Sequence, residues 1–427
     1  MKKEVYIFAL IFLLLIVPFG LSLDEDEEDE LVDKAYDCLE SRINETCSSS
    51  LDDNIFVLIA TGDCRSEVID ASSNEECWPS GDCRVKQTAQ AMLAYEVDGR
   101  STDKAKEWLL EQTTSTTEMQ WLLQIESSQP TTCTIEYSGL QYSVSIGADK
   151  KINSNAGSCL QLHKDSYYGD DWWLEVSPSC YENEFEISCS NDFITSMLFK
   201  KQNSLTINVL GDSTSSSAGA TVVEEVDSKC FTDTGVCNYE ATLWATFILD
   251  YLDENIDSYV PYILTMKEDY EEYMPEVFLY LITDSSDFKN EILANQRIDH
   301  WEESGNDFYD TALALYPFQG QNPLEKNKAK EWLSEEQNSD GCWGSIKNTA
   351  FILHSVWQRS FNRGGGGTDD NQTAEDFDCT DEGYFCMSSK SCDVAEGSEL
   401  DYGCSFPNVC CSKEILLDEC VYQGGEI

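Results

Sequence analysis

The chain has 427 residues, and 80 aspartate and glutamate residues against 27 lysine and arginine residues give it a net charge of −53. Charge of this sign repels phosphate backbones and anionic lipid headgroups, so nucleic acid and acidic membrane surfaces are excluded as expected partners. The length is enough for about two to four domains, each with its own core.

The first segment, residues 1–22, has the pattern of a signal peptide. Lys2 and Lys3 precede an apolar run that ends at Pro18 and Gly20, as in cleaved export signals. The alternative is an uncleaved anchor, because the apolar run is almost long enough to span a bilayer. No later stretch is apolar enough to span a membrane. We therefore expect an extracellular or cell-surface protein without a stable span in its mature chain.

Nineteen cysteines in an exported chain are expected to form mostly disulfides. Twelve lie in residues 38–342, an even number, and seven lie in residues 379–420, which leaves one without a partner. The expected bridging residues are Cys38, Cys47, Cys64, Cys77, Cys83, Cys133, Cys159, Cys180, Cys189, Cys230, Cys237, Cys342, Cys379, Cys386, Cys392, Cys404, Cys410 and Cys411. Their pairing in the body of the chain stays open. Asn44 and Asn371 stand in sequons and are candidate glycosylation sites.

An internal repeat organises the body of the chain. The sequence Lys-Ala-Lys-Glu-Trp-Leu at residues 104–109 recurs at residues 328–333. Small residues beside large apolar ones let helices pack closely, so each repeat predicts a turn followed by a helical hairpin. Residues 23–130 and 212–360 are accordingly assigned to two parts of one helical domain. The expected helical runs are 88–93, 241–249, 311–315 and 349–353.

Between these parts, residues 131–211 predict a small inserted β domain. Polar and apolar residues alternate at 142–146, 185–189 and 205–209, which is the period of a half-buried strand. Four cysteines fall in this block and can staple it internally. The serine-rich residues 212–219 indicate a linker that returns to the helices.

The C-terminal region changes character twice. Residues 361–377 are rich in glycine, polar and acidic residues, without period, and predict a flexible linker. Residues 378–427 hold seven cysteines with few large apolar residues, so disulfides must hold this module together. Cys420 begins a sequence that repeats the opening of the module at Cys379, and we expect that a second cysteine-rich unit starts there and is cut short.

The turn Gln337-Asn-Ser-Asp340-Gly341-Cys-Trp343-Gly344 resembles the Gln-to-Trp repeat of the terpenoid cyclase and protein prenyltransferase superfamily. The resemblance implies a mainly α fold, an α/α toroid of helical hairpins, complete or incomplete, with the β domain inserted. In that family the glutamine and tryptophan tie consecutive hairpins together, and the glycines permit the tight turn.

The cysteine spacing after the linker resembles the clip-type domain of secreted protease zymogens, which ends in a Cys-Cys pair. Six cysteines allow fifteen pairings. The resemblance implies one of them, in which Cys379 pairs with Cys410, Cys386 with Cys404 and Cys392 with Cys411. It also implies a recognition or tethering module rather than an active site.

Catalytic patterns are incomplete throughout the sequence. Squalene-type cyclases need an Asp-x-Asp-Asp acid cluster and thioester proteins a Cys-Gly-Glu-Gln sequence, and neither occurs. Prenyltransferases bind zinc through an Asp-x-Cys pair and a histidine. Asp340 and Cys342 supply such a pair, but Asp310 stands where that family has its histidine. Because Cys342 is more simply half of a disulfide in an oxidising compartment, we expect no metal, cofactor or catalytic residue.

The sequence thus predicts a noncatalytic scaffold that binds an extracellular protein or glycan. One alternative is a cyclase- or prenyltransferase-like enzyme that uses the toroid cavity. Another is carbohydrate binding by the β domain, where Trp172 and Trp173 either stack on a sugar ring or pack in the core. The apolar Leu174 and Val176 that follow favour the core. A bridged Cys342 favours the scaffold, whereas a reduced Cys342 grouped with Asp310 and Asp340 favours the enzyme.

Overall fold

The structure is a computed structural model. It describes residues 25–43, 47–116, 118–165, 167–202 and 204–359 and, near the C-terminus, residues 379, 384–387, 392, 397–400, 404 and 409–413. The predicted signal peptide, both sequons, the linker 361–377, Cys420 and most of the C-terminal module lie outside the described residues. Within them, every helix is too short or too polar to cross a membrane.

The expectation of a mainly α toroid is wrong, because the described residues form a mixed α/β protein with twelve α-helices and fourteen strands. Strands extend beyond the predicted insertion at both ends. β1 (Thr113–Ser115) and β2 (Met119–Glu126) lie in the segment that was assigned to helices. The predicted return linker is occupied largely by β9 (Asn208–Ser216), and β10 (Thr221–Glu225) follows it. Serine and threonine are readily accommodated in paired strands, so polarity alone did not indicate a loop here.

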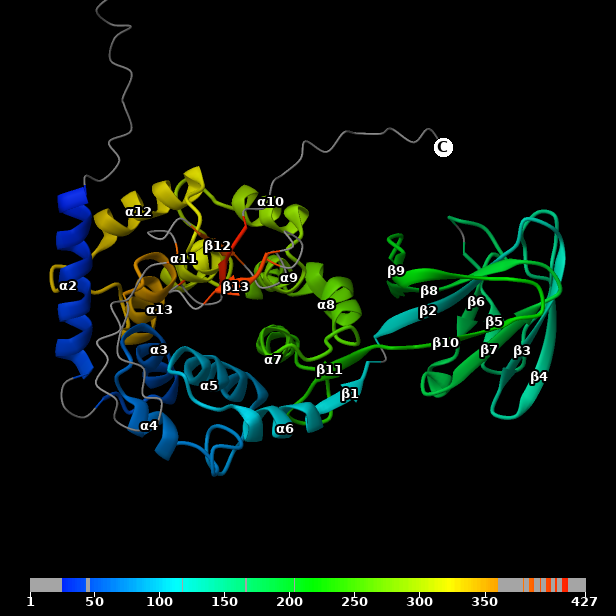
Figure 1. Ribbon diagram of the computed structural model, residues 1–427, viewed down its shortest axis with the longest axis horizontal. Helices are drawn as coiled ribbons and strands as arrows, with labels where there is room; N and C mark the ends of the chain where they lie inside the picture. Colours follow the sequence, from blue (N-terminus) through cyan, green and yellow to red (C-terminus); the bar gives the residue numbers. More distant parts are fainter. Residues whose placement is uncertain are drawn as a thin grey trace, which may run out of the picture. The chain divides into compact units, whose positions relative to one another are not determined.

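The chain divides into two compact units, and residues 1–70, 97–100 and 286–427 make up the first. In it, α13 packs against α2, α3 and α11, and α3 and α13 lie side by side (Figure 1). Residues 54–60 of α3 are all buried, as in a helix enclosed by its neighbours. The helices of this unit are α2 (Glu25–Ile43), α3 (Leu51–Thr61), α4 (Arg65–Asp70), α10 (Ser286–Ala294), α11 (Asp307–Leu315), α12 (Leu324–Glu336) and α13 (Ile346–Val356).

Local sequence signals set the ends of these helices. The Ser50 hydroxyl accepts a hydrogen bond from the backbone N–H of Asp53 at the start of α3, and α3 ends at Gly62 with φ 78°. The Ser345 hydroxyl caps α13 in the same way through Asn348 N–H. These side chains satisfy N–H groups that the helix itself leaves without a partner.

Residues 71–96 and 101–285 make up the second unit. Its helices are α5 (Val85–Val97), α6 (Asp103–Glu111), α7 (Tyr239–Tyr251), α8 (Val260–Met266) and α9 (Pro275–Thr283). α7 packs against α8 and α9. β1 pairs with β11 (Lys229–Phe231), so the two chain crossings between the helices and the β domain run side by side as a two-stranded ribbon. The helical runs predicted from the repeat fall in α5, α7, α11 and α13, as expected.

The β domain consists of two antiparallel sheets. One has the order β5-β6-β2-β8-β9 and the other β10-β7-β3-β4. Its remaining strands are β3 (Thr131–Tyr137), β4 (Leu140–Ile146), β5 (Leu160–Leu162), β6 (Leu174–Val176), β7 (Glu184–Cys189) and β8 (Phe193–Lys201). Trp121, Phe185 and Phe199 are fully buried in its interior. All four of its cysteines pair within the domain, Cys133 with Cys189 and Cys159 with Cys180, which the sequence had left as one possibility.

In the C-terminal region the described residues form a small sheet of β12 (Phe385–Met387), β14 (Val409–Cys411) and β13 (Glu399–Leu400), in that order. Cys379 is bridged to Cys410 and Cys392 to Cys411. These are two of the three pairs that the clip resemblance implies, and Cys404 is disulfide-bonded as well.

A turn device recurs in both units. A buried aromatic residue precedes a helix, and its backbone N–H donates to a threonine hydroxyl inside that helix. The pairs are Trp78 with Thr88, Phe231 with Thr242, Trp301 with Thr311 and Trp343 with Thr349, at 2.9 to 3.2 Å. Because a buried N–H without a partner is costly, the threonine is what allows each ring to be buried at a turn.

Candidate functional site

The turn that resembles the Gln-to-Trp repeat connects three segments of the first unit. Gln337 Nε2 donates to the carbonyl of Leu31 in α2 and to that of Gly341 in the turn, both at 2.9 Å. Trp343 is fully buried, and its Nε1 donates to the Leu333 carbonyl of α12 at 2.7 Å. The motif therefore fastens α2, α12 and the turn together.

Glycine is required in this turn because the backbone of α2 lies against it. Gly341 has φ 93°, and a Cβ there would lie 2.3 Å from the carbonyl oxygen of Lys34. Both the left-handed conformation and the close approach exclude larger residues. A need for glycine in a tight turn was expected from the sequence. The contact between Gly341 and α2 could not be predicted from it.

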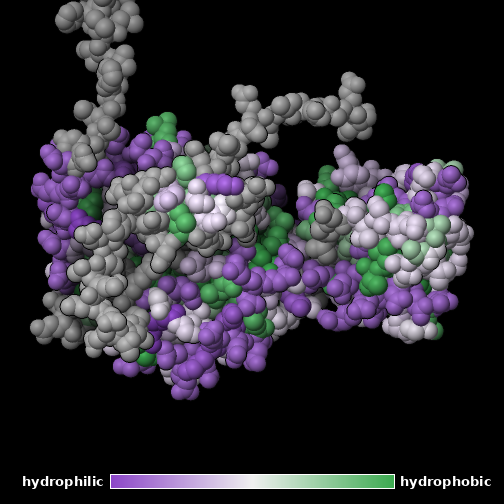
Figure 2. Space-filling model, viewed as in Figure 1, coloured by the Kyte–Doolittle hydropathy of each residue, from purple (hydrophilic) through white to green (hydrophobic). Residues whose placement is uncertain are grey.

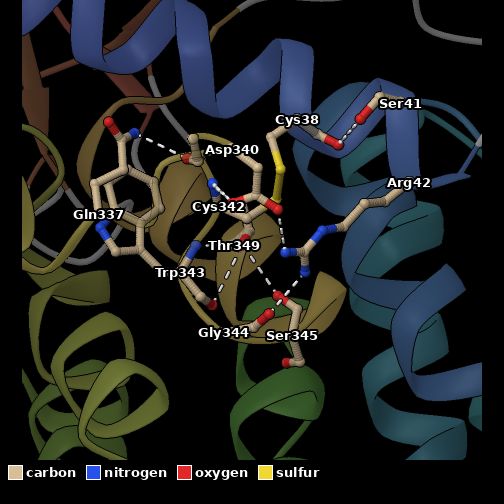
Figure 3. A network of polar contacts seen from close by, with 11 residues as sticks. Cys38, Ser41, Arg42, Gln337, Asp340, Cys342, Trp343, Gly344, Ser345 and Thr349 are labelled. Atoms are coloured by element: carbon tan, nitrogen blue, oxygen red, sulfur yellow. Dashed lines mark hydrogen bonds and ion pairs between the residues drawn. A yellow bond between two sulfur atoms is a disulfide. The ribbon is translucent and has the colours of Figure 1, made fainter.

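Cys342 is bridged to Cys38 of α2 across 304 residues of sequence. Beside the bridge, Arg42 Nη2 lies 2.7 Å from Asp340 Oδ2, and Arg42 Nη1 donates to the Gly344 carbonyl at 2.7 Å. Figure 3 shows Arg42 reaching from α2 to both groups. The hydrogen bond from Arg42 lowers the pKa of Asp340. Both halves of the candidate zinc pair are thus engaged with the same helix.

Three potential metal ligands lie close together at this turn. The sulfur atoms of Cys38 and Cys342 and a carboxylate oxygen of Asp340 lie within 4.8 Å of one another. However, zinc is bound by thiolates, and the bridge consumes both sulfur atoms. The arrangement therefore fits a covalent fastening better than a metal centre.

Asp310, the third candidate ligand, is not part of the group formed by Cys38, Asp340 and Cys342. Its carboxylate accepts hydrogen bonds from Ser304 N–H at 2.7 Å and from Ser304 Oγ at 2.5 Å, and burial raises its pKa. Among the described residues, Asp310 belongs to no group of three or more potential ligands. It braces the turn that precedes α11, and its position at the start of a helix, beside Trp301, is the signal that could have shown this role.

The three histidines are also accounted for. His300 stacks on Trp332 with ring centroids 4.3 Å apart, and His163 lies in the β domain with Nδ1 3.0 Å from Glu175. His354 of α13 is fully buried beside Tyr316, and burial lowers its pKa to about 3. His300 does form a group of potential ligand atoms with two exposed carboxylates, those of Glu302 and Asp307, but such groups are common on acidic surfaces.

Helix α2 has further anchors that the sequence did not reveal. Glu28 accepts hydrogen bonds from Lys330 Nζ of α12 and from Trp357 Nε1, each at 2.5 Å. Tyr36 donates to the Trp357 carbonyl at 3.1 Å. These contacts join residues about 300 positions apart, and nothing in the local sequence of either segment marks its partner.

The second candidate site is a loop of the β domain, of which residues 163–165 and 167–173 are described. Trp172 and Trp173 are half-buried, so the preference for the core was only partly right. The rings that reach into solvent are those of Tyr167 and Tyr168, with 68% and 42% of their surface exposed. The two tryptophans were the predicted contacts and the two tyrosines were not predicted, although all four lie in one aromatic segment.

An open cleft adjoins this loop. It has a volume of about 610 Å³, and its lining includes Asp171 at the end of the loop, together with Asp149, Lys151 and Asn153. The cleft lies where the N-terminal end of β3 meets the C-terminal end of β4. Hydroxyl, amide and charged groups line it, so it suits a polar ligand.

In comparisons with protein-family models, with curated proteins and with solved structures, no similar protein was found.

Proposed function

We propose that this chain is a noncatalytic extracellular binding protein, in which disulfide-fastened helical segments and small modules present surfaces to a partner. One observation carries the proposal: Cys342, the residue on which the zinc-enzyme alternative depends, is paired with Cys38. Asp340, its neighbour, is held by Arg42. The residues that could have supplied chemistry are used to hold the fold.

The distribution of disulfides supports the extracellular setting. All twelve cysteines of the body are paired, in six bridges that occur in both units. Disulfides persist in oxidising compartments and are rare in the cytosol. The multiple bridges therefore fit an extracellular protein, and an exported, cell-surface location is the finer proposal.

The negative charge of the surface favours a neutral or basic partner. With a net charge of −53, the chain repels anions over about a Debye length. Figure 2 shows a face on which hydrophilic residues predominate and apolar residues are scattered, which is not the pattern of an extended hydrophobic interface. Contacts with the partner are then expected to be local and polar, with aromatic anchors.

The test is a map of free thiols together with zinc analysis on the purified native chain. Unreduced protein is alkylated, digested and examined by mass spectrometry for modified Cys38 and Cys342, and a reduced and alkylated sample is the control that both peptides are detectable. We expect neither cysteine to be modified and zinc to be far below one equivalent. One equivalent of zinc together with alkylation of Cys342 after chelation would overturn the proposal.

A further inference from the structure

We propose that residues 163–165 and 167–173, which belong to one loop, and the adjoining cleft form a binding site for a neutral glycan. The inference rests on the proposed noncatalytic binding function and names the ligand class. It commits to one occupant, a chain of uncharged sugars, because the site combines exposed aromatic rings with a cleft of hydroxyl, amide and carboxylate groups. That combination matches the apolar faces and the hydroxyl-bearing edges of a pyranose ring.

The exposed rings form a connected group at the tip of the loop. Tyr167 and Tyr168 meet edge to face with centroids 4.9 Å apart, and Tyr168 meets Trp173 at 5.8 Å. The Tyr168 hydroxyl donates to the carbonyl of Leu205, itself 57% exposed. Single exposed apolar residues are ordinary, but three aromatic rings in contact, two of them turned to solvent, offer a stacking surface.

The loop is held in its shape before any ligand arrives. Asp165 Oδ1 accepts hydrogen bonds from the backbone N–H groups of Tyr167 and Tyr168, at 2.8 and 2.9 Å. Its other oxygen, Oδ2, pairs with Nζ of Lys200 at 3.1 Å, and Lys200 is only 4% exposed. A fixed loop loses little conformational entropy on binding, so the rings are preorganised rather than merely exposed.

The cleft supplies the polar half of the site. Thr132, Ser145 and Asn153 line it together with Asp149 and Asp171. Sugar hydroxyls both donate and accept hydrogen bonds, and carboxylate, hydroxyl and amide groups complement them. The volume of about 610 Å³ lies within the usual range for ligand sites. Asp171 lies in the loop and also lines the cleft, so the cleft reaches the base of the loop.

Charge selects a neutral glycan over an acidic one. Two carboxylates, Asp149 and Asp171, and one cation, Lys151, lie in the cleft lining, and Asp171 is paired with Lys164 of the loop at 2.5 Å. Lys151 is already engaged, because its Nζ donates to the Asp170 carbonyl at 2.8 Å and lies 5.4 Å from the centre of the Trp172 ring. A carboxylated or sulfated sugar would meet a negative cleft on a strongly negative protein.

The experiment is calorimetric titration of the full chain with four hexasaccharides. Three are neutral, the β-1,4-linked oligomers of glucose, mannose and N-acetylglucosamine, and the fourth is the acidic oligomer of galacturonate. We expect at least one neutral oligomer to bind with a dissociation constant in the micromolar to millimolar range and the acidic one not to bind. Tyr167→Ala should weaken that binding about tenfold through loss of ring stacking, whereas Tyr167→Phe should retain it.

Leu140→Ala is the matched control, since Leu140 is 57% exposed at another position of the same domain, and it should bind as the parent does. Because Tyr167 is 68% exposed, its removal leaves the core intact, which circular dichroism verifies. The proposal is overturned if no neutral oligomer binds at millimolar concentration, if galacturonate binds as tightly, or if Tyr167→Ala binds like the parent. The thiol map is independent, so a zinc-bound Cys342 would overturn the noncatalytic function without altering this result.

Discussion

Removing the bridge between Cys38 and Cys342 should lower the free energy of unfolding of the protein more than removing a short-range bridge. The double substitution Cys38→Ser and Cys342→Ser removes both halves of the bridge, so neither is left as a free thiol. The bridge closes a loop of 304 residues, which the bridges nested inside it shorten to about 220. In the chain-entropy model the variant has a more disordered unfolded state, which lowers its free energy of unfolding by about 5 kcal/mol.

Cys77→Ser with Cys83→Ser is the matched comparison, because that bridge spans six residues and is worth about 2 kcal/mol in the same model. Urea unfolding followed by far-ultraviolet circular dichroism gives both free energies of unfolding. The long-range variant should lose more than twice as much as the short-range one. Equal losses would refute the idea that the bridge fastens α2, and would mean that Gln337, Arg42 and Lys330 hold the helix without it.

Two further outcomes follow from buried groups of the same unit. Thr349→Val keeps the shape of the side chain but removes the acceptor of the Trp343 N–H. Urea unfolding should therefore show a free energy of unfolding lower by about 1–3 kcal/mol. A loss no larger than that caused by the same substitution at an exposed threonine would contradict the role given to this hydrogen bond. His354 has a pKa of about 3 in the fold against about 6.5 when unfolded, so the unfolded chain binds more protons between these values and stability falls as pH drops below 6.5. Between pH 6.5 and 4.5 the free energy of unfolding should fall by about 2 kcal/mol from this cause. In urea unfolding, His354→Leu should lose correspondingly less stability over the same pH range. Identical pH profiles for the variant and the parent would contradict a buried neutral imidazole.

Features written in short stretches of sequence could be predicted. The pairing of aromatic residue and helix at Trp343 and Thr349 is visible as a Trp followed by a Thr-Ala run, and all four predicted runs are helical. The even count of twelve body cysteines predicted complete pairing there, and six bridges are present. Local signals succeed here because caps, turns and helical periods act within a few residues.

The fold class failed because strand pairing is nonlocal. Residues 119–126 contain the run Trp121-Leu122-Leu123, which has no clean alternation and was assigned to a helix. In the structure this strand lies between β6 and β8 in its sheet, and all three of these residues are buried. A strand covered on both faces shows an apolar run rather than a period of two. Its partner residues in β8 lie up to 82 positions away, at Met119 and Lys201.

The same difference between local and nonlocal signals applies to the candidate sites. That Cys342 would be bridged followed from the compartment and the residue type, whereas its partner Cys38 could not be chosen from spacing. Trp172 and Trp173 drew attention to this loop, but Tyr167 and Tyr168 were missed, because Asp165 beside them is paired with Lys200, 35 residues away. In the sequence alone Tyr167 and Tyr168 are two ordinary tyrosines. The hydrogen bonds from their backbone to Asp165, and the pairing of Asp165 with the buried Lys200, are visible only in the fold.

The acidity of the chain explains why α2 needs a covalent fastening. This helix carries nine carboxylates and two basic residues, Lys34 and Arg42, and it must pack in a protein that is itself strongly negative. Three ion pairs attach the helix at separate points: its Arg42 pairs with Asp340, its Glu28 with Lys330 and its Asp33 with Arg359. Such partly exposed pairs are individually worth little and weaken as salt rises. The Cys38–Cys342 bridge is insensitive to salt, so it holds the helix where electrostatic attraction alone would be least dependable.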